Sequence, residues 1–251
     1  MNWKINPSYS KLTEFVIELP HNFSKLGESL FKKRNEIRMI SVEGHDVNVK
    51  SFKIPHLINK IAYKYFRGSK ARHSYEYGIR LNNLGVNTPE PIAYVETTKA
   101  GLFHQSFYIS KQHVYDFTIR DLIGFDFPDK ENILKQFAVF TYDKLHKNGV
   151  HHLDYSRGNI LITRLENQQY DFSIVDINRM RFEKMGYIKG LKNFAQIWAS
   201  EEELEIVARE YARINNKDEE EAVTLLIQFD KEHKEKIKRK KSLKKRLKSS
   251  K

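Results

Sequence analysis

The sequence predicts an α+β protein of two lobes, a small strand-rich lobe followed by a mostly helical one. Residues 1–112 contain short segments in which apolar and polar residues alternate, with one helical segment among them. Residues 113–230 contain longer segments with apolar residues at helical spacing. Residues 231–251 are strongly basic, and we expect them to form a mobile tail.

The first lobe is predicted to contain four strands and one helix. The helix is expected over residues 70–84, because Ser69 can cap its start and Gly85 can end it. A turn at residues 43–46 joins the first two strands, and a turn around Pro89 precedes the last two. The strands are expected within residues 36–54, at 92–96 and at 107–110.

The second lobe is predicted to be helical apart from one hairpin. A helix is expected over residues 130–147, where apolar residues recur at helical spacing until Asn148 and Gly149. The hairpin joins residues 160–162 to 172–175 across a polar insert. Two amphipathic helices are then expected, at residues 201–214 behind the N-cap Ser200 and at residues 218–229.

The composition limits the class of protein. Hydrophobic residues make up 40% and charged residues 30% of the chain, which is typical of a globular domain and not of a disordered one. The chain has no cysteine, so disulfides, thiolate metal sites and a cysteine nucleophile are excluded. There is no signal-like segment and no apolar run near the roughly 20 residues of a membrane span. We therefore expect a cytoplasmic protein that can associate peripherally with the inner membrane.

The positive charge is concentrated at the C-terminus. Residues 231–251 hold 12 Lys or Arg and 2 Glu, whereas the rest of the chain holds 32 basic and 30 acidic residues. The folded body is therefore close to neutral and offers no basic surface to read a nucleic acid. We expect no nucleic-acid partner.

The clearest chemistry lies in residues 151–161. His152 is followed two residues later by Asp154 and then by Asn159, and a further acid, Asp176, comes after the predicted hairpin. Phosphoryl transfer from a nucleotide needs a carboxylate beside the attacking hydroxyl and hard oxygen ligands that hold magnesium against the phosphates. Asp154 suits the first task, and Asn159 and Asp176 suit the second. We therefore expect ATP and Mg²⁺ as cofactors.

The order of these residues resembles that of protein kinases. The spacing from His152 to Asn159 resembles the catalytic loop H-R-D-x-x-x-x-N, and Asp176 stands where the D-F-G segment begins. The runs at 145–154 and 174–181 resemble, more narrowly, the bacterial lipopolysaccharide core kinases, which phosphorylate Kdo or heptose sugars. The resemblance spans roughly residues 25–185. It implies a protein-kinase-like fold and an ATP-dependent kinase that acts on a sugar hydroxyl of the inner core.

The same resemblance implies the residues that anchor the nucleotide. Residues 47–50 resemble the V-A-I-K strand, so Lys50 would contact the phosphates and Glu76, on the next helix, would be its ion-pair partner. Lys53 competes with Lys50, but alternation along the strand places Lys53 on the valine face. Gly27 is the single glycine where a phosphate-binding loop would be expected.

Three arginines near the catalytic residues are candidates for binding the acceptor: Arg157, Arg179 and Arg181. An acidic, lipid-linked sugar would favour guanidinium groups, because they bind carboxylate and phosphate with paired hydrogen bonds. The basic tail suggests a further partner, an anionic membrane surface, with shallow apolar contacts from Ile237, Leu243 and Leu247.

Several departures from the kinase pattern leave alternatives open. The glycine-rich loop is sparse, Asp176 is followed by Ile177 and Asn178 instead of Phe-Gly, and no A-P-E segment is present. One alternative is a RIO-like protein kinase or a small-molecule phosphotransferase. Another is a pseudokinase scaffold without catalytic activity.

Overall fold

The computed structural model describes the backbone of residues 1–54 and 68–249. The chain divides into two compact units. The first unit consists of residues 1–114 and 176–179, and the second consists of residues 115–175 and 180–251. The short segment 176–179 therefore belongs with the N-terminal unit, although it lies far along the chain.

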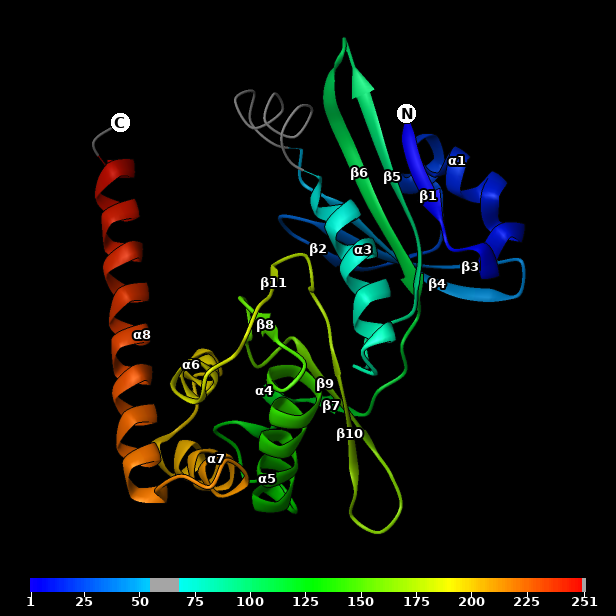
Figure 1. Ribbon diagram of the computed structural model, residues 1–251. Helices are drawn as coiled ribbons and strands as arrows, with labels where there is room; N and C mark the ends of the chain where they lie inside the picture. The colour runs from blue at the N-terminus through cyan, green and yellow to red at the C-terminus, as the bar shows by residue number, and fades with distance from the viewer. Residues whose placement is uncertain (55–67, 250–251) are drawn as a thin grey trace. The chain divides into compact units, whose positions relative to one another are not determined.

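The first unit is built on a six-stranded sheet with the order β1-β5-β6-β4-β3-β2 (Figure 1). Neighbouring strands are antiparallel throughout. The strands are β1 (Asn2–Ile5), β2 (Glu28–Lys32), β3 (Glu36–Val42), β4 (His45–Phe52), β5 (Pro91–Lys99) and β6 (Leu102–Lys111). The helices are α1 (Thr13–Asn22) and α3 (Lys70–Asn83), with short 3₁₀ segments at Pro7–Leu12 and Phe23–Lys25.

The two faces of this sheet carry separate cores. On one face Val47 and Val49 pack with α1 residues such as Val16. On the other, Phe52 packs with Tyr75 of α3 and with tyrosines of β5 and β6. Since side chains alternate along β4, Lys50 lies on the α3 face, as the spacing predicted.

The local signals in the first unit are confirmed. The turn between β3 and β4 places Glu43 and Gly44 at positive φ, as a tight hairpin requires. The side chain of Ser69 accepts a hydrogen bond from the backbone N–H of Arg72 and caps α3. The sequence patterns did not predict β1, β2 or α1.

The second unit is mainly helical, with two small antiparallel sheets, β10-β9-β7 and β11-β8. Its strands are β7 (Phe117–Thr118), β8 (Val150–His152), β9 (Ile160–Arg164), β10 (Tyr170–Ile174) and β11 (Met180–Phe182). Its helices are α4 (Ile119–Leu122), α5 (Lys130–Phe140), a π-helical turn at Thr141–His146, α6 (Tyr187–Asn193), a 3₁₀ turn at Phe194–Gln196, α7 (Glu201–Ile214) and α8 (Glu219–Ser249).

Aromatic side chains form the centre of the second unit. Phe137 of α5 lies with its ring 5.8 Å from that of Tyr155, 5.9 Å from Phe172 and 5.6 Å from Phe194. Tyr211 of α7 lies 5.2 Å from Phe194. Tyr155 follows Asp154 directly, so this core anchors the loop that carries the predicted catalytic residue.

Helix α8 corrects the predicted boundary at residue 229. It runs without a break for 31 residues and includes most of the basic segment that we expected to be a mobile extension (Figure 1). Helix α7 agrees with its prediction, and Ser200 and Glu203 form a capping box at its start. Among the helices of the described residues, none has the length and apolar character needed to cross a membrane.

Candidate active site

The predicted site residues divide between the two units. The first unit contains Gly27, Lys50, Glu76, Asp176 and Arg179, and the second contains Asp154, Arg157, Asn159 and Arg181. The chain passes from the second unit to the first between Val175 and Asp176.

The predicted catalytic loop, which runs from His152 to Asn159, begins where β8 ends. The backbone oxygen of Asp154 accepts hydrogen bonds from the N–H of Ser156 (2.7 Å) and from the side-chain amide of Asn159 (2.8 Å). The N–H of Asn159 in turn donates to the oxygen of Ser156 (2.8 Å). These bonds fix the spacing of the two predicted functional side chains. They also use the Nδ2 group of Asn159, so its Oδ1 atom is the one suited to bind a metal.

His152 stabilises this loop through a contact with its backbone. It is fully buried, and its Nδ1 atom lies 3.1 Å from the backbone nitrogen of Asp154. Its Nε2 atom lies 3.0 Å from the oxygen of Val175, the last residue before Asp176. The imidazole therefore connects the segments that carry the two predicted acids.

A series of buried polar side chains extends from the backbone of His152. Asn193 of α6 donates to the backbone oxygen of His152 (3.1 Å), and its Oδ1 lies 3.3 Å from Nε2 of His146. The Nδ1 of His146 lies 2.8 Å from the hydroxyl of Tyr211. Gly190 is required beside this chain, because a Cβ atom there would lie 2.0 Å from the Tyr211 hydroxyl. Burial lowers the pKa of His146 to about 4, so its ring is neutral at pH 7.

In the first unit, Lys50 and Asp176 form an ion pair with an Nζ–Oδ1 distance of 2.8 Å. The Lys50 side chain is only 15% exposed and lies over the ring of Phe52. The same carboxylate oxygen accepts a short hydrogen bond from the side-chain amide of Asn178. Asp176 adopts a φ of 56°, a left-handed conformation that is uncommon outside glycine. The carboxylate is thus held in one orientation by groups from two distant parts of the chain.

The expected pair between Lys50 and Glu76 is not the one in the structure. Glu76 pairs instead with Arg72, one helical turn earlier, with an Nε–Oε1 distance of 2.8 Å. Both partners of that pair are more than 40% exposed. The structure gives Lys50 a different partner, Asp176, and a role of Glu76 in nucleotide binding stays a prediction.

Gly27 lies just before β2, at the opposite end of that strand from the β2–β3 turn. It has a φ of 57°, and a Cβ atom there would lie 2.0 Å from the backbone oxygen of Met39. The glycine is therefore explained by close packing of backbone against β3. The turn itself, residues 33–35, contains no glycine and carries the cations Lys33 and Arg34.

Sequence patterns missed Lys70, the first residue of α3. It is half-buried, and burial lowers the pKa of its ammonium group. The charges of Arg34, Arg179 and Lys50 lower this pKa further, and that of Asp176 raises it. Three other cations and one carboxylate of the first unit therefore act on the charge of Lys70. The only sequence signal was the position of Lys70 after an N-cap, which predicts the helix and not this neighbourhood.

The three predicted acceptor arginines occupy different environments. Arg157 is half-buried in the catalytic loop, and its backbone oxygen accepts from the N–H of Arg120 (2.9 Å). Arg181 is exposed on β11, opposite His151 of β8. Arg179 is exposed and belongs to the first unit.

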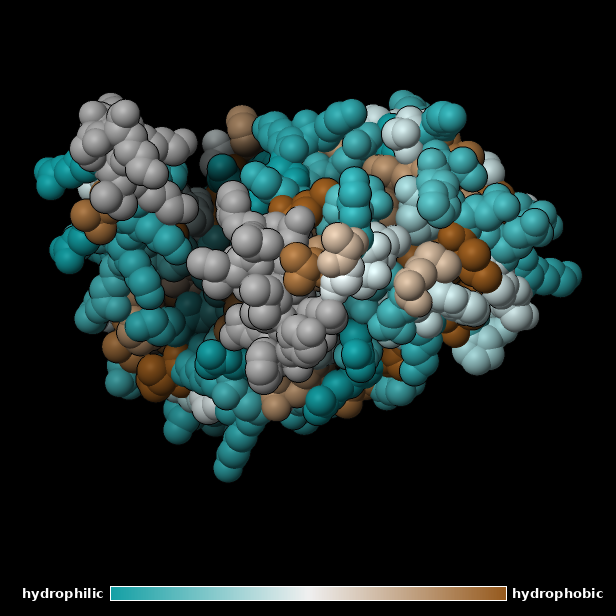
Figure 2. Space-filling model, turned by 90° about the horizontal axis from the view of Figure 1, so that it is seen from above, coloured by the Kyte–Doolittle hydropathy of each residue, from teal (hydrophilic) through white to brown (hydrophobic). Residues whose placement is uncertain are grey.

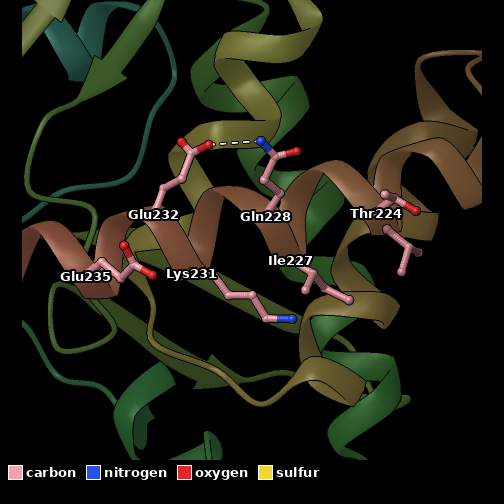
Figure 3. A pocket seen from close by; sticks show the side chains of 7 residues that line it. Thr224, Ile227, Gln228, Lys231, Glu232 and Glu235 are labelled. Atoms are coloured by element: carbon pink, nitrogen blue, oxygen red, sulfur yellow. Dashed lines mark hydrogen bonds between the residues drawn. The ribbon is translucent and has the colours of Figure 1, made fainter.

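A hollow of about 590 Å³ lies along α8, far in sequence from all of these residues (Figure 3). Gln228 donates to Glu232, one turn further along the same helix (3.0 Å), and Ile227 and Lys231 project from the same stretch of helix (Figure 3). None of the predicted site residues lines it, so we assign it no part in nucleotide chemistry.

Two solved structures resemble this chain in fold. Among solved structures, one of WaaP in complex with acyl carrier protein matches with a TM-score of 0.62 and 16% identity, covering 94% of this chain and 99% of that one. The Rio2 kinase–ADP/Mg²⁺–phosphoaspartate complex from Chaetomium thermophilum has a TM-score of 0.48 and 15% identity, covering 86% of this chain and 67% of that one. No curated protein sequence matches.

The family comparison is decisive, because it spans more than half of the chain. The model of the lipopolysaccharide kinase (Kdo/WaaP) family matches residues 53–217, a range that holds Asp154, Asn159 and Asp176. The fold agrees, with a strand-rich sheet in the N-terminal unit and helices in the C-terminal one. The chain therefore belongs to the lipopolysaccharide kinase (Kdo/WaaP) family and is an ATP-dependent kinase with a protein-kinase-like fold.

Proposed function

We propose that this kinase phosphorylates a sugar hydroxyl, on Kdo or heptose, in the inner core of lipopolysaccharide. The observation that carries the proposal is the ordered catalytic loop, in which His152 and Asn159 both bond to the backbone of Asp154. Such pre-positioning is what phosphoryl transfer requires, because its catalysis consists mainly of placement and electrostatic stabilisation.

Each residue has one task in this mechanism. The Asp154 carboxylate orients the acceptor hydroxyl and accepts its proton. Asn159 and Asp176 supply the hard oxygen atoms that Mg²⁺ prefers, so the residues present fit this ion. When bound, Mg²⁺ neutralises charge on the phosphates. Lys50 contacts the phosphate chain, and its ion pair with Asp176 keeps both side chains oriented before the nucleotide binds.

The acceptor is expected to carry negative charge. Arg157, Arg179 and Arg181 are the candidates for binding a carboxylate or phosphate of a lipid-linked sugar, since guanidinium groups bind such anions bidentately. Arg179 and Arg181 are exposed, as a residue that meets a large substrate must be.

We further propose that α8 binds an anionic membrane surface, where a lipid-linked acceptor would be found. Beyond Asp230 the helix carries mainly hydrophilic residues (Figure 2, left), and Lys238, Arg239, Lys240 and Lys241 are all exposed. A basic side chain near an anionic leaflet contributes about 1 kcal/mol, so a few of them suffice for reversible binding. Leu243 is 58% exposed and can add a shallow apolar contact, whereas the Leu247 side chain lies outside the described residues.

The experiment that tests the proposed reaction offers Mg²⁺-ATP and a panel of acceptors to the purified enzyme. The panel contains Kdo-lipid A, a heptose-extended core, a generic protein substrate and small-molecule alcohols. Mass spectrometry then locates the new phosphate, and Asp154→Ala serves as the inactive control. We expect the phosphate on a core sugar. Transfer only to protein or to a small molecule, or binding of ATP without any transfer, would contradict the proposal.

A further inference from the structure

The segment that leads into α4 runs along the predicted catalytic loop within the second unit. The N–H of Asp116 donates to the oxygen of Ile162 (2.9 Å), and β7 pairs with β9 at the two residues that follow Asp116. Beyond β7, the N–H of Arg120 donates to the oxygen of Arg157 (2.9 Å). The backbone of Arg120 is therefore fixed beside the loop that carries Asp154.

The guanidinium of Arg120 lies against Gly158 of this loop. A Cβ atom at Gly158 would lie 2.3 Å from Nη2 and 2.8 Å from Cζ of Arg120. Gly158 does not have a positive φ, so its backbone does not need the conformational freedom of glycine. The glycine is explained instead by the space that the guanidinium occupies. Because Gly158 directly precedes Asn159, the cation lies beside a predicted metal ligand of the loop.

No carboxylate of the described residues neutralises the charge of Arg120. Its side chain is exposed, and it forms no hydrogen bond or ion pair with any of these residues. The next residue, Asp121, instead accepts hydrogen bonds from the N–H and the hydroxyl of Thr118, both at 2.8 Å. Arg209 and Arg213 of α7, by contrast, each pair with a glutamate. A fixed and exposed guanidinium without such a partner is suited to bind an anion.

The unit to which Arg120 belongs indicates which anion it meets. Lys50 and Asp176, which are proposed to act on the nucleotide, belong to the first unit, whereas Arg120 belongs to the same unit as Asp154. Asp154 is proposed to orient the acceptor hydroxyl. We propose that Arg120 binds a carboxylate or phosphate of the acceptor and thereby selects an anionic substrate. This inference rests on the proposed function, since it takes Asp154 as the residue that meets the acceptor.

The test compares Arg120→Ala with the wild type on Kdo-lipid A, whose sugar carboxylate and lipid phosphates are anionic. Arg120→Ala should raise the KM for this acceptor about tenfold or more, as expected for a lost charge-assisted hydrogen bond, and should change kcat and the KM for ATP by less than about twofold. Arg120→Lys should recover part of the loss. Lys144→Ala, at another exposed cation of the second unit, is the control and should behave like the wild type.

Two modified acceptors identify the anionic group, one with the Kdo carboxylate converted to its methyl ester and one with the lipid phosphates removed. The modification that removes the partner of Arg120 should raise the acceptor KM of the wild type and leave that of Arg120→Ala unchanged. If neither modification distinguishes the two proteins, the inference is overturned.

A second variant tests the contact between Arg120 and Gly158. Gly158→Ala should displace the guanidinium and raise the acceptor KM of the otherwise wild-type protein. In the Arg120→Ala background the same substitution should change this KM by less than about twofold, because no guanidinium is left to displace. Additive effects of the two substitutions would contradict the proposed contact.

The outcomes separate this inference from the proposed function. Transfer to Kdo-lipid A with an unchanged acceptor KM in Arg120→Ala, or with a rise in the KM for ATP alone, would overturn only the inference. Transfer to a different anionic acceptor, with a KM that depends on Arg120, would support the inference and overturn only the proposed core sugar. Transfer to a neutral alcohol alone, with a KM that does not depend on Arg120, would overturn both.

Discussion

The backbone N–H of Asp154 points at Nδ1 of His152 across 3.1 Å, and this contact defines the state of the histidine. Because an N–H group must donate, Nδ1 is the acceptor and is unprotonated. The ring proton then lies on Nε2, which donates to the oxygen of Val175 (3.0 Å). A neutral histidine of one tautomer thus links the catalytic loop to the residue that precedes Asp176.

Replacing Asp154 by alanine should reduce kcat by about 10²–10⁴-fold, the usual contribution of a positioned acid–base group. The affinity for ATP should be retained, because the backbone oxygen that accepts from Asn159 remains. Steady-state kinetics together with calorimetry would measure both quantities. Asp143→Ala, at an exposed acid of the same unit, is the control. Near-normal turnover of Asp154→Ala would exclude this residue as the base.

The face of β4 can be tested with two lysines three residues apart. Lys50→Ala should strongly impair nucleotide use, because Lys50 lies on the α3 face and pairs with Asp176. Lys53→Ala should have little effect, since Lys53 is exposed beyond the end of the strand.

Asp176→Asn should abolish activity even at saturating acceptor, because the amide is a weaker ligand for magnesium than the carboxylate. The test is to measure the rate of each of the three variants as a function of ATP concentration. A larger loss of activity in Lys53→Ala than in Lys50→Ala would contradict the assignment of Lys50.

Arg179→Ala and Arg181→Ala should raise the KM for the acceptor more than the KM for ATP, if these exposed guanidinium groups bind an anionic sugar. The two Michaelis constants, measured with the other substrate saturating, give the answer. Arg80→Ala, at a basic residue of α3 outside the candidate site, is the control. Equal changes in both constants would point to a structural role.

The buried His146 predicts a loss of stability in acid. Its pKa is about 4 in the folded state, against an ordinary value of 6.5. Between these values the unfolded chain binds a proton that the folded state does not, so stability falls as pH is lowered from about 6.5 to 4. The two pKa values set a limit of about 3 kcal/mol for this group. Urea unfolding across this pH range should show a flatter dependence in His146→Gln than in the wild type, and no flattening in the control His21→Gln. An unchanged slope in His146→Gln would contradict the prediction.

Membrane binding should be tested with a chain that ends at Arg239. Ending the chain at Asp230 would also remove Lys234, which pairs with Asp230 (2.6 Å) and donates to the oxygen of Ala199. The shorter protein should sediment less with anionic liposomes and keep its activity on a detergent-dispersed acceptor. Binding of the full chain should weaken as salt rises, because the attraction is screened. Salt-insensitive binding, or equal binding by both forms, would rule out this role of α8.

Local chemistry explains which elements the sequence predicts well. Ser69 and Ser200 cap helices where expected, and Gly44 completes a tight turn, because each effect acts within a few residues. Strand β2 was missed because all of its residues are exposed, which leaves no alternation to detect. The end of α8 was misplaced because no glycine or proline interrupts a run of good helix formers.

The candidate site shows the same limit at longer range. Motif spacing identified Lys50 and Asp176 separately, but their pairing joins residues 126 positions apart and depends on the fold. Glu76 pairs with Arg72, which lies four residues earlier on the same helix and is closer in sequence than Lys50.

The continuity of α8 changes what a basic C-terminus can do. A flexible extension would tether the enzyme loosely and leave its orientation free. A helix rises about 1.5 Å per residue, so the part of α8 beyond Asp230 spans roughly 28 Å as a stiff rod. Its inner portion is anchored by buried residues such as Leu226, so the rod moves with the second unit. The helix would therefore act as a spacer. When the charges at its far end bind a surface, its length would set the distance between that surface and the predicted catalytic loop.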